Sequence, residues 1–235
     1  MFEPAALRSR LWTRTGGARL HRALRHAIST LVPMSGGTLV WLNGPHGGGK
    51  THTAHELVRR IDGAVLSDPE HVGFAMRKLY PAAVRPDYRE LPAWREATTA
   101  TLIDVLDRTN GVVIAPQTIT NPELLASLLD PIRQTRHSVA HVTLMMSVGT
   151  LRGRLRSRGD VIASFAQDHA GSHLEALSDV AFATHIDTEH LSLSQTAEAV
   201  AETAELSIED SNSRWIEREL RALTLRVASV RPSWA

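Results

Sequence analysis

A glycine-rich segment with a single lysine carries the clearest chemistry in this sequence. Residues 44–51 spell Gly-Pro-His-Gly-Gly-Gly-Lys-Thr and satisfy the pattern G-x-x-x-x-G-K-[ST] in full. An apolar stretch precedes them and an amphipathic stretch follows, which is the strand-loop-helix context in which this pattern binds phosphate. The loop N–H groups and the positive end of the following helix form a cradle for nucleotide phosphates. The predicted ATP-binding residues here are Gly44, Pro45, His46, Gly47, Gly48, Gly49, Lys50, Thr51 and His52.

Two side chains of this segment have predicted roles in phosphoryl transfer. Lys50 is one of only two lysines among 26 basic residues, and its ammonium would act on the γ-phosphate. Thr51 offers a hydroxyl to Mg²⁺, which offsets the charge that develops during transfer. His52 and His55 lie one helical turn apart, but no third ligand accompanies them, so solvated or packing histidines are favoured over a metal pair.

Two carboxylates follow the second predicted strand. Phosphoryl transfer to a hydroxyl needs a base near the acceptor, and in doubly wound folds the strand ends face the ligand crevice. Asp68 is therefore the predicted catalytic base, and Glu70 would share in holding the metal or its waters. The alternative is that Asp68 only caps a helix that starts at Pro69. The third strand ends without a carboxylate, which leaves metal binding to this pair or makes the chain a binder with weak turnover.

The segment between the second and third strands combines arginine with aromatic side chains. This composition suits a ligand that has rings together with anionic or hydroxylated groups, although core packing explains any single residue as well. The predicted substrate contacts are Phe74, Arg77, Trp94 and Arg95 in this segment, and Gln117 after the third strand. Further along, Arg154 and Arg158 share one helical face and would close over the nucleotide as a lid. No aromatic stacking platform accompanies these arginines, which argues against nucleic acid as a partner.

Apolar runs alternate with amphipathic ones from Thr38 onward, which predicts one doubly wound α/β domain over residues 37–209 with five parallel strands. The predicted strands are 38–42, 64–66, 112–115, 139–145 and 183–187. The predicted helices are 51–60, 69–79, 94–108, 122–134, 150–158, 175–182 and 194–206, the last capped by Ser194.

Composition excludes several classes of function. The formal net charge is +1, from 26 basic and 25 acidic residues, so no overall field would attract nucleic acid. The chain has no cysteine, which excludes disulfides, thiolate metal sites and a cysteine nucleophile. No apolar run approaches the roughly 20 residues of a membrane-spanning helix. We expect a cytoplasmic protein, associated with a membrane at most peripherally.

Extensions flank the predicted domain on both sides. Residues 1–36 are predicted to form a basic, helical N-terminal extension, with Met34 as an alternative start just before the first strand. Residues 210–235 form a predicted amphipathic helix whose apolar seam is bordered by arginines and by Trp215 and Trp234. This helix has three possible partners: the parent domain, a second chain in a homodimer, or an anionic membrane surface.

Four sequence segments together resemble the tunicamycin-resistance (TmrB-like) protein family. They are W-L-N-G-P-H-G-G-G-K-T-H-T-A at Trp41–Ala54, D-P-E-H-V-G-F-A-M-R at Asp68–Arg77, L-P-A-W-R at Leu91–Arg95 and V-T-L-M at Val142–Met145. The resemblance runs from about residue 37 to 206. It implies a three-layer P-loop nucleotide-kinase-like fold that uses ATP and Mg²⁺, with the loop as nucleotide site, Asp68 as base, and Arg154 with Arg158 as lid.

The same resemblance implies a role in resistance to a nucleoside antibiotic. The expected activity is transfer of the ATP γ-phosphate to a hydroxyl of a tunicamycin-like drug. One alternative is an ATP-binding protein that protects by sequestering the drug. Others are a kinase of a nucleotide sugar or another small metabolite, and an ATP-dependent regulatory protein with no small-molecule acceptor.

Overall fold

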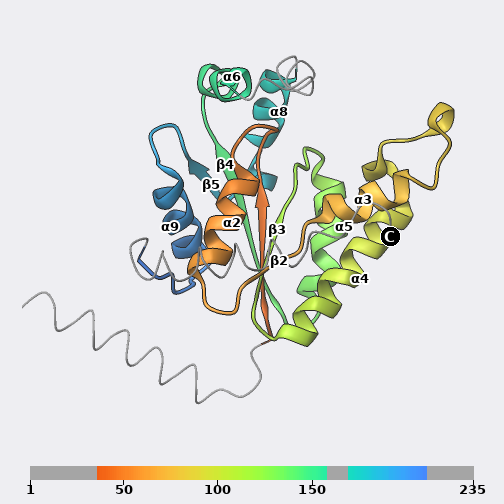
Figure 1. Cartoon of the computed structure of the whole chain (residues 1–235), viewed down its shortest axis with the longest axis horizontal. Helices are drawn as coiled ribbons and strands as arrows, with labels where there is room; N and C mark the ends of the chain where they lie inside the picture. The colour runs from red at the N-terminus through yellow and green to blue at the C-terminus, as the bar shows by residue number, and fades with distance from the viewer. Residues whose placement is uncertain (1–35, 158–168, 211–235) are drawn as a thin grey trace, which may run out of the picture. The chain divides into compact units, whose positions relative to one another are not determined.

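The computed structural model describes residues 36–157 and 169–210, and its centre is a parallel β-sheet (Figure 1). Five strands pair in the order β2-β3-β1-β4-β5. Their bounds are β1 Thr38–Asn43, β2 Val65–Leu66, β3 Val112–Pro116, β4 Ser138–Met145 and β5 His185–Asp187. Strand β1 is central, because Thr38 is in register with Val112 of β3 on one side and Ser138 of β4 on the other. The predicted five-stranded parallel sheet is confirmed.

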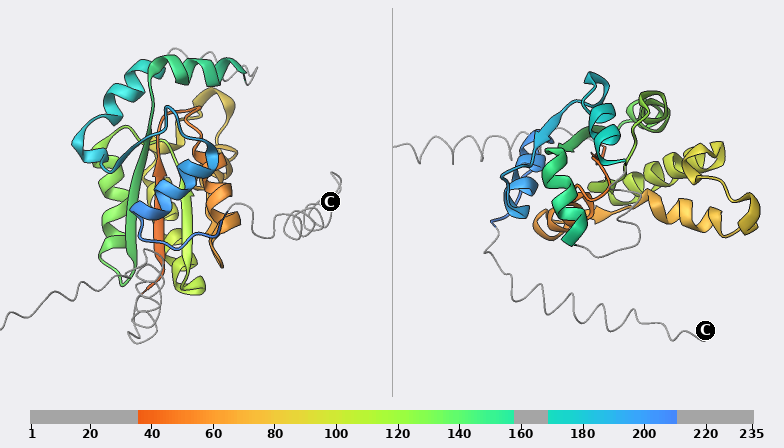
Figure 2. Two further views of the ribbon diagram at one scale, coloured as in Figure 1. Left: turned by 90° about the vertical axis from the view of Figure 1, so that its left-hand side faces the viewer. Right: turned by 90° about the horizontal axis from the view of Figure 1, so that it is seen from above.

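Helices cover both faces of the sheet. The helices are α2 Lys50–Arg60, α3 Pro69–Arg77, α4 Pro92–Thr109, α5 Pro122–Arg133, α6 Val148–Ser157, α8 Ala170–Leu177 and α9 Leu193–Thr203, with 3₁₀ turns η1 Ala82–Val84, η2 Tyr88–Glu90 and η3 Val180–Phe182. Helices α2 and α9 lie on one face, α4 and α5 lie on the other, and α6 and α8 lie beyond the carboxyl ends of the strands (Figures 1 and 2). This arrangement gives the three layers that were predicted.

The alternating side chains of β1 explain why both faces are covered. Leu39 and Trp41 are fully buried in the cluster that includes residues of α4 and α5. Val40 and Leu42 are fully buried in a second cluster with α2 and α9. A strand that is apolar on both sides must be sandwiched between two helical layers to remove its surface from water.

A buried arginine joins the helix after the glycine-rich loop to the last described helix. Arg60 ends α2 and is only 2% exposed. Its Nη2 donates to Glu198 Oε1 at 2.8 Å, its Nη1 to Ser194 Oγ at 2.8 Å, and its Nε to the Glu209 carbonyl at 2.7 Å. These bonds satisfy the guanidinium in the interior, so the C-terminal end of α2 is fixed against α9.

Side-chain capping explains two of the differences between the predicted and observed helices. The helix expected over residues 175–182 is α8 followed by η3, because the Asp179 side chain accepts from the Ala181 N–H and starts a new turn. The cap of α9 is Ser192 instead of Ser194, since Ser192 forms a reciprocal capping box with Gln195. Such a box satisfies two orphan N–H groups together, which a single serine cap does not.

The extensions cannot be compared with the structure. The predicted N-terminal extension, the C-terminal amphipathic helix and Arg158 lie outside the described residues, apart from Gly36 and Asp210. The division into residues 1–36, 37–209 and 210–235 therefore stays a prediction. Among the helices of the described residues, none is both long and apolar enough to cross a bilayer.

We expect the fold to be less stable at acid pH because of His141, a half-buried residue on β4. Burial lowers the pKa of His141 from 6.5 to about 4. The unfolded chain therefore binds this proton first, and stability decreases as pH falls from about 6.5 to 4, by roughly 3 kcal/mol from this group. Urea unfolding should show that the free energy of unfolding of wild type, relative to that of His141→Gln, decreases by this amount as the pH falls from about 6.5 to 4. A difference that does not change with pH would contradict the lowered pKa of His141.

Candidate active site

The glycine-rich loop adopts a phosphate-binding shape between β1 and α2. Gly49 caps α2 at φ 94°, and Gly47 has φ 81°, both values that favour glycine. A Cβ on Gly47 would lie 2.5 Å from Leu155 Cδ2, so a side chain there would also clash with α6. The Lys50 Nζ donates to the carbonyls of Gly44 at 3.0 Å and Pro45 at 2.9 Å. The loop thus wraps its own lysine at the N-terminus of α2, where anions bind.

A cavity of about 180 Å³, here called the phosphate cavity, lies against this loop. Its lining residues are His46, Gly47, Gly49, Lys50, Thr51, Asp68, Glu70 and Pro116. The structure therefore brings both predicted carboxylates to the same space as the predicted phosphate-binding lysine, from segments that are about twenty residues apart in the sequence. The segments that follow β1 and β2 meet there beside the end of β3, at the carboxyl edge of the sheet.

Asp68 caps α3 and also lines the phosphate cavity. Its Oδ1 accepts from the Glu70 N–H at 2.9 Å, and Pro69 occupies the first helical turn. A carboxylate has a second oxygen, so capping and proton transfer are compatible roles. Burial raises the pKa of the Glu70 carboxyl, and the neighbouring charge of Asp68 raises it further. The surroundings of Glu70 therefore favour its protonated form.

The donors in the phosphate cavity suit Mg²⁺. The Thr51 hydroxyl is exposed, and with the oxygens of Asp68 and Glu70 it provides the hard ligands that this ion prefers. Within residues 36–157 and 169–210, no group of three or more histidine or carboxylate side chains could hold a metal alone. His52 and His55 are both exposed on α2.

A second cavity, of about 340 Å³, also borders the loop and is here called the nucleoside cavity. Its lining residues are Gly47, Gly48, Gly49, His52, Thr53, Arg154, Thr188, Leu191, Leu193 and Thr196. Leucine side chains beside polar groups suit a base and a ribose. Arg154 reaches this cavity from α6 and donates from Nη2 to the Thr188 carbonyl at 3.0 Å. The predicted lid arginine is therefore adjacent to the predicted nucleotide site.

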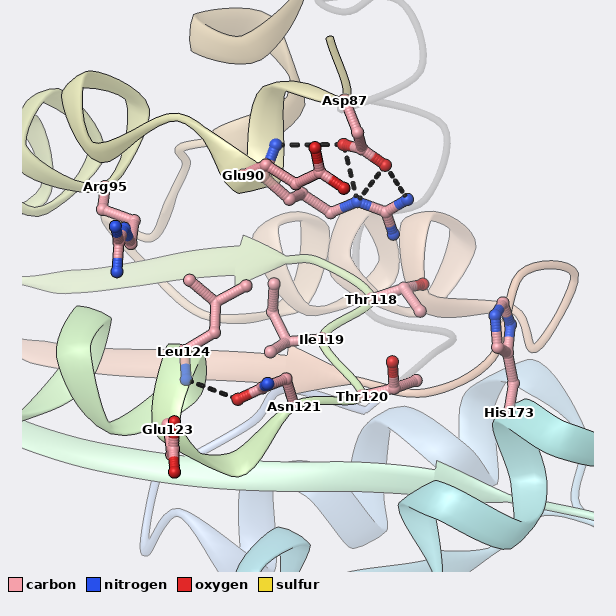
Figure 3. Close-up of a pocket in the computed structure, with 11 residues that line it drawn as sticks. Asp87, Glu90, Arg95, Thr118, Ile119, Thr120, Asn121, Glu123, Leu124 and His173 are labelled. Atoms are coloured by element: carbon pink, nitrogen blue, oxygen red, sulfur yellow. Dashed lines mark hydrogen bonds and ion pairs between the residues drawn. The ribbon is translucent and has the colours of Figure 1, made fainter.

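A third cavity, of about 460 Å³, is here called the acceptor cavity (Figure 3). It is lined by Asp87, Arg89, Glu90, Arg95, Thr118, Ile119, Thr120, Asn121, Glu123, Leu124 and His173. Arg89 is held by Asp87, with Nε to Oδ1 at 3.0 Å and Nη2 to Oδ2 at 2.5 Å. That pairing raises the pKa of Arg89 and lowers that of Asp87. A preorganised ion pair among hydroxyl, amide and further carboxylate groups suits a hydroxylated ligand.

Histidines connect the loop with the acceptor side. The His46 ring in the loop lies 5.7 Å from the His173 ring on α8, measured between centroids. Burial, followed by the charge of Lys50, lowers the pKa of His46 to about 3. Burial also lowers the pKa of His173. Both rings are therefore neutral near neutral pH, so they add hydrogen-bonding groups to this region without adding positive charge.

The structure separates the five predicted substrate contacts into two groups. Arg95 lines the acceptor cavity, Phe74 is 45% exposed with its ring edge-on to Tyr88, and Arg77 is half-buried on α3. Trp94 and Gln117 are buried instead. The Trp94 indole donates to the Pro69 carbonyl at 3.1 Å, which joins α4 to α3.

Gln117 supports the acceptor cavity from behind. Its Nε2 donates to the Tyr88 hydroxyl at 3.3 Å, and its Oε1 accepts from the Thr118 N–H at 2.9 Å. These bonds correct the prediction that Trp94 and Gln117 contact the substrate directly: both hold the walls of the site. Sequence reasoning missed Asp87, Arg89 and His173. The alternating charges around Tyr88 could have indicated the ion pair, whereas nothing local marks His173.

Comparison with known proteins identifies relatives of this arrangement. A family model described as an AAA domain matches residues 39–181. The tunicamycin resistance protein of Deinococcus radiodurans has 33% sequence identity and a TM-score of 0.62, over 74% of this chain and 99% of that chain. Among curated proteins, no sequence matched. The predicted family resemblance is confirmed.

Two kinases share the fold at lower identity. A gluconokinase from Sinorhizobium meliloti 1021 has 15% identity and a TM-score of 0.51, over 83% of this chain and 99% of that chain. The APS kinase of Mycobacterium tuberculosis, solved with AMPPNP and APS, has 16% identity and a TM-score of 0.52, over 72% of this chain and 98% of that chain. These likenesses confirm the P-loop kinase-like fold.

Proposed function

Because this chain belongs to the AAA domain family and to the family of tunicamycin resistance proteins, we propose that it is an ATP-dependent phosphotransferase acting on a nucleoside antibiotic of the tunicamycin type. The reaction transfers the γ-phosphate of ATP to a hydroxyl of the drug. The observation that carries this proposal is the phosphate cavity, where Lys50 and Thr51 meet Asp68 and Glu70. Transfer to a hydroxyl needs a base beside the phosphate site, which Asp68 would supply, whereas sequestration of the drug does not.

Each group near the cavities has a role in this reaction. The loop, Lys50 and Thr51 would hold the ATP phosphates and Mg²⁺, and the bound ion offsets charge on the transferred group. The acceptor oxygen attacks the γ-phosphorus, Asp68 takes the hydroxyl proton, and the bond to ADP breaks. Glu70 would hold the ion or its waters.

The surrounding residues would bind the two substrates. Arg89 and Arg95 would bind polar groups of the acceptor, with Phe74 and Arg77 at its outer side. On the nucleotide side, His52 would contact ATP beside the loop, and Arg154 with Arg158 would close over it as a lid.

Mass spectrometry of the drug provides the direct test. Tunicamycin and related nucleoside antibiotics are incubated with the full-length protein, ATP and Mg²⁺, and both the drug mass and ADP release are followed. We expect the drug to gain one phosphoryl group with stoichiometric ADP. Tight drug binding with an unchanged mass would favour sequestration. Phosphorylation of a nucleotide sugar in place of the drug would favour the metabolite kinase.

The extensions belong to this proposal as predictions only. A C-terminal amphipathic helix over residues 210–235 would add peripheral contact with a membrane or with a second chain, at the place where a lipophilic drug accumulates. Cosedimentation with vesicles and measurement of the oligomeric state distinguish these two partners.

A further inference from the structure

An exposed apolar tip projects on the acceptor side of the domain. It consists of residues 77–86, from the end of α3 through η1, and extends away from the sheet (Figures 1 and 2). Leu79 is 82% exposed and Val84 is 66% exposed, and the Tyr80 side chain between them is 36% exposed. Large apolar side chains so exposed on one short segment usually mark a contact surface.

The tip is also basic. Lys78 and Arg85 flank its apolar side chains, and no acidic residue occurs in the sequence from His71 to Pro86. The Arg85 Nη2 donates to the Tyr80 carbonyl at 3.4 Å, a bond that joins the two sides of the tip. Apolar side chains beside cations suit the boundary of an anionic membrane, where the apolar groups enter the acyl chains and the cations pair with the headgroups.

The shape favours a lipid surface over a protein. A stable protein interface buries about 800 Å² on each partner, with a well-packed core. A narrow projecting tip with a few apolar side chains does not offer such an area, but two or three inserted side chains are enough for interfacial contact when cations assist. We propose that residues 77–86 dock on a membrane surface that contains anionic phospholipids. This contact does not depend on the proposed phosphotransferase activity or on residues 210–235.

The absence of cysteine allows a local test in the full-length chain. Leu79→Cys is labelled with an environment-sensitive fluorophore, and Val180→Cys provides the matched control, since Val180 is 85% exposed outside the tip. Vesicles contain either phosphatidylglycerol with phosphatidylcholine or phosphatidylcholine alone. We expect a blue shift at position 79 with the anionic vesicles only, decreasing as salt rises.

The label also distinguishes vesicle binding by the tip from vesicle binding by residues 211–235. If residues 211–235 alone bind vesicles, the protein cosediments but the label at position 79 does not shift, and the proposal is overturned. An equal shift at position 180, or at position 79 with phosphatidylcholine alone, overturns it as well. Lys78→Gln removes one exposed cation and should lower vesicle affinity about fivefold. An unchanged affinity would contradict the electrostatic part of the proposal.

Discussion

Lys50→Ala should lower the rate of phosphoryl transfer at least about 100-fold while the domain stays folded. Lys50 places an ammonium at the phosphate cavity, and loss of one preorganised contact to developing charge costs about 3 kcal/mol of transition-state stabilisation. ADP release with saturating drug measures the effect, and thermal unfolding checks the fold. The chain offers a matched control in Lys78→Ala, because Lys78 is its other lysine and is exposed at the end of α3. Retained turnover in Lys50→Ala would refute the assignment.

The bonds that Lys50 makes in this structure refine the same experiment. Its Nζ donates to the Gly44 and Pro45 carbonyls, so removal of the side chain also loosens the loop. Part of the lost activity could then come from weaker ATP binding. Titration of a fluorescent ATP analogue separates the two effects, since loss of a transition-state contact lowers kcat much more than it weakens nucleotide binding.

The phosphate cavity could be predicted from sequence because its parts are local. The glycine-rich loop requires a strand before it and a helix after it, and both are visible as apolar periodicity around residues 44–51. The position of Asp68 at a strand end could also be predicted, since it follows an apolar strand and precedes a proline that starts a helix. The loop and Asp68 then come together because parallel strands end at one edge of the sheet.

The acceptor cavity could not be predicted in the same way. Its residues come from η2, α4, the loop after β3, α5 and α8, and composition does not show which side of each element faces the cavity. Trp94 illustrates the difficulty, because an aromatic residue beside Arg95 suits a ligand as well as a core. The tight contact of α3 with Tyr88 decides the matter: a Cβ on Gly73 would lie 2.4 Å from the Tyr88 ring. Trp94 is buried beside it, because its ring lies 5.2 Å from the Tyr88 ring and its indole N–H donates to the Pro69 carbonyl.

Asp68→Asn should abolish phosphoryl transfer while ATP binds with nearly unchanged affinity. Asparagine caps a helix as well as aspartate does, so α3 should keep its start and the fold its stability. The amide cannot take the proton of an acceptor hydroxyl, and the expected loss in kcat is about 10²- to 10⁴-fold. Asp179→Asn provides the matched control, because Asp179 caps η3 through an equivalent bond to the Ala181 N–H. Single-turnover assays and ATP titration measure the two quantities.

Asp68→Asn also distinguishes phosphorylation from sequestration when drug resistance is measured in cells. If Asp68 is the base, cells that produce Asp68→Asn should lose protection together with turnover. Protection that persists without turnover would mean that drug binding is sufficient, and the phosphotransferase proposal would give way to sequestration. Turnover that persists would reduce Asp68 to a helix cap, and Glu70 would become the base to test. If Glu70 is the base, the pH profile should show it. The pKa of the Glu70 carboxyl is raised, so activity would increase with pH over a range higher than that in which an ordinary glutamate loses its proton.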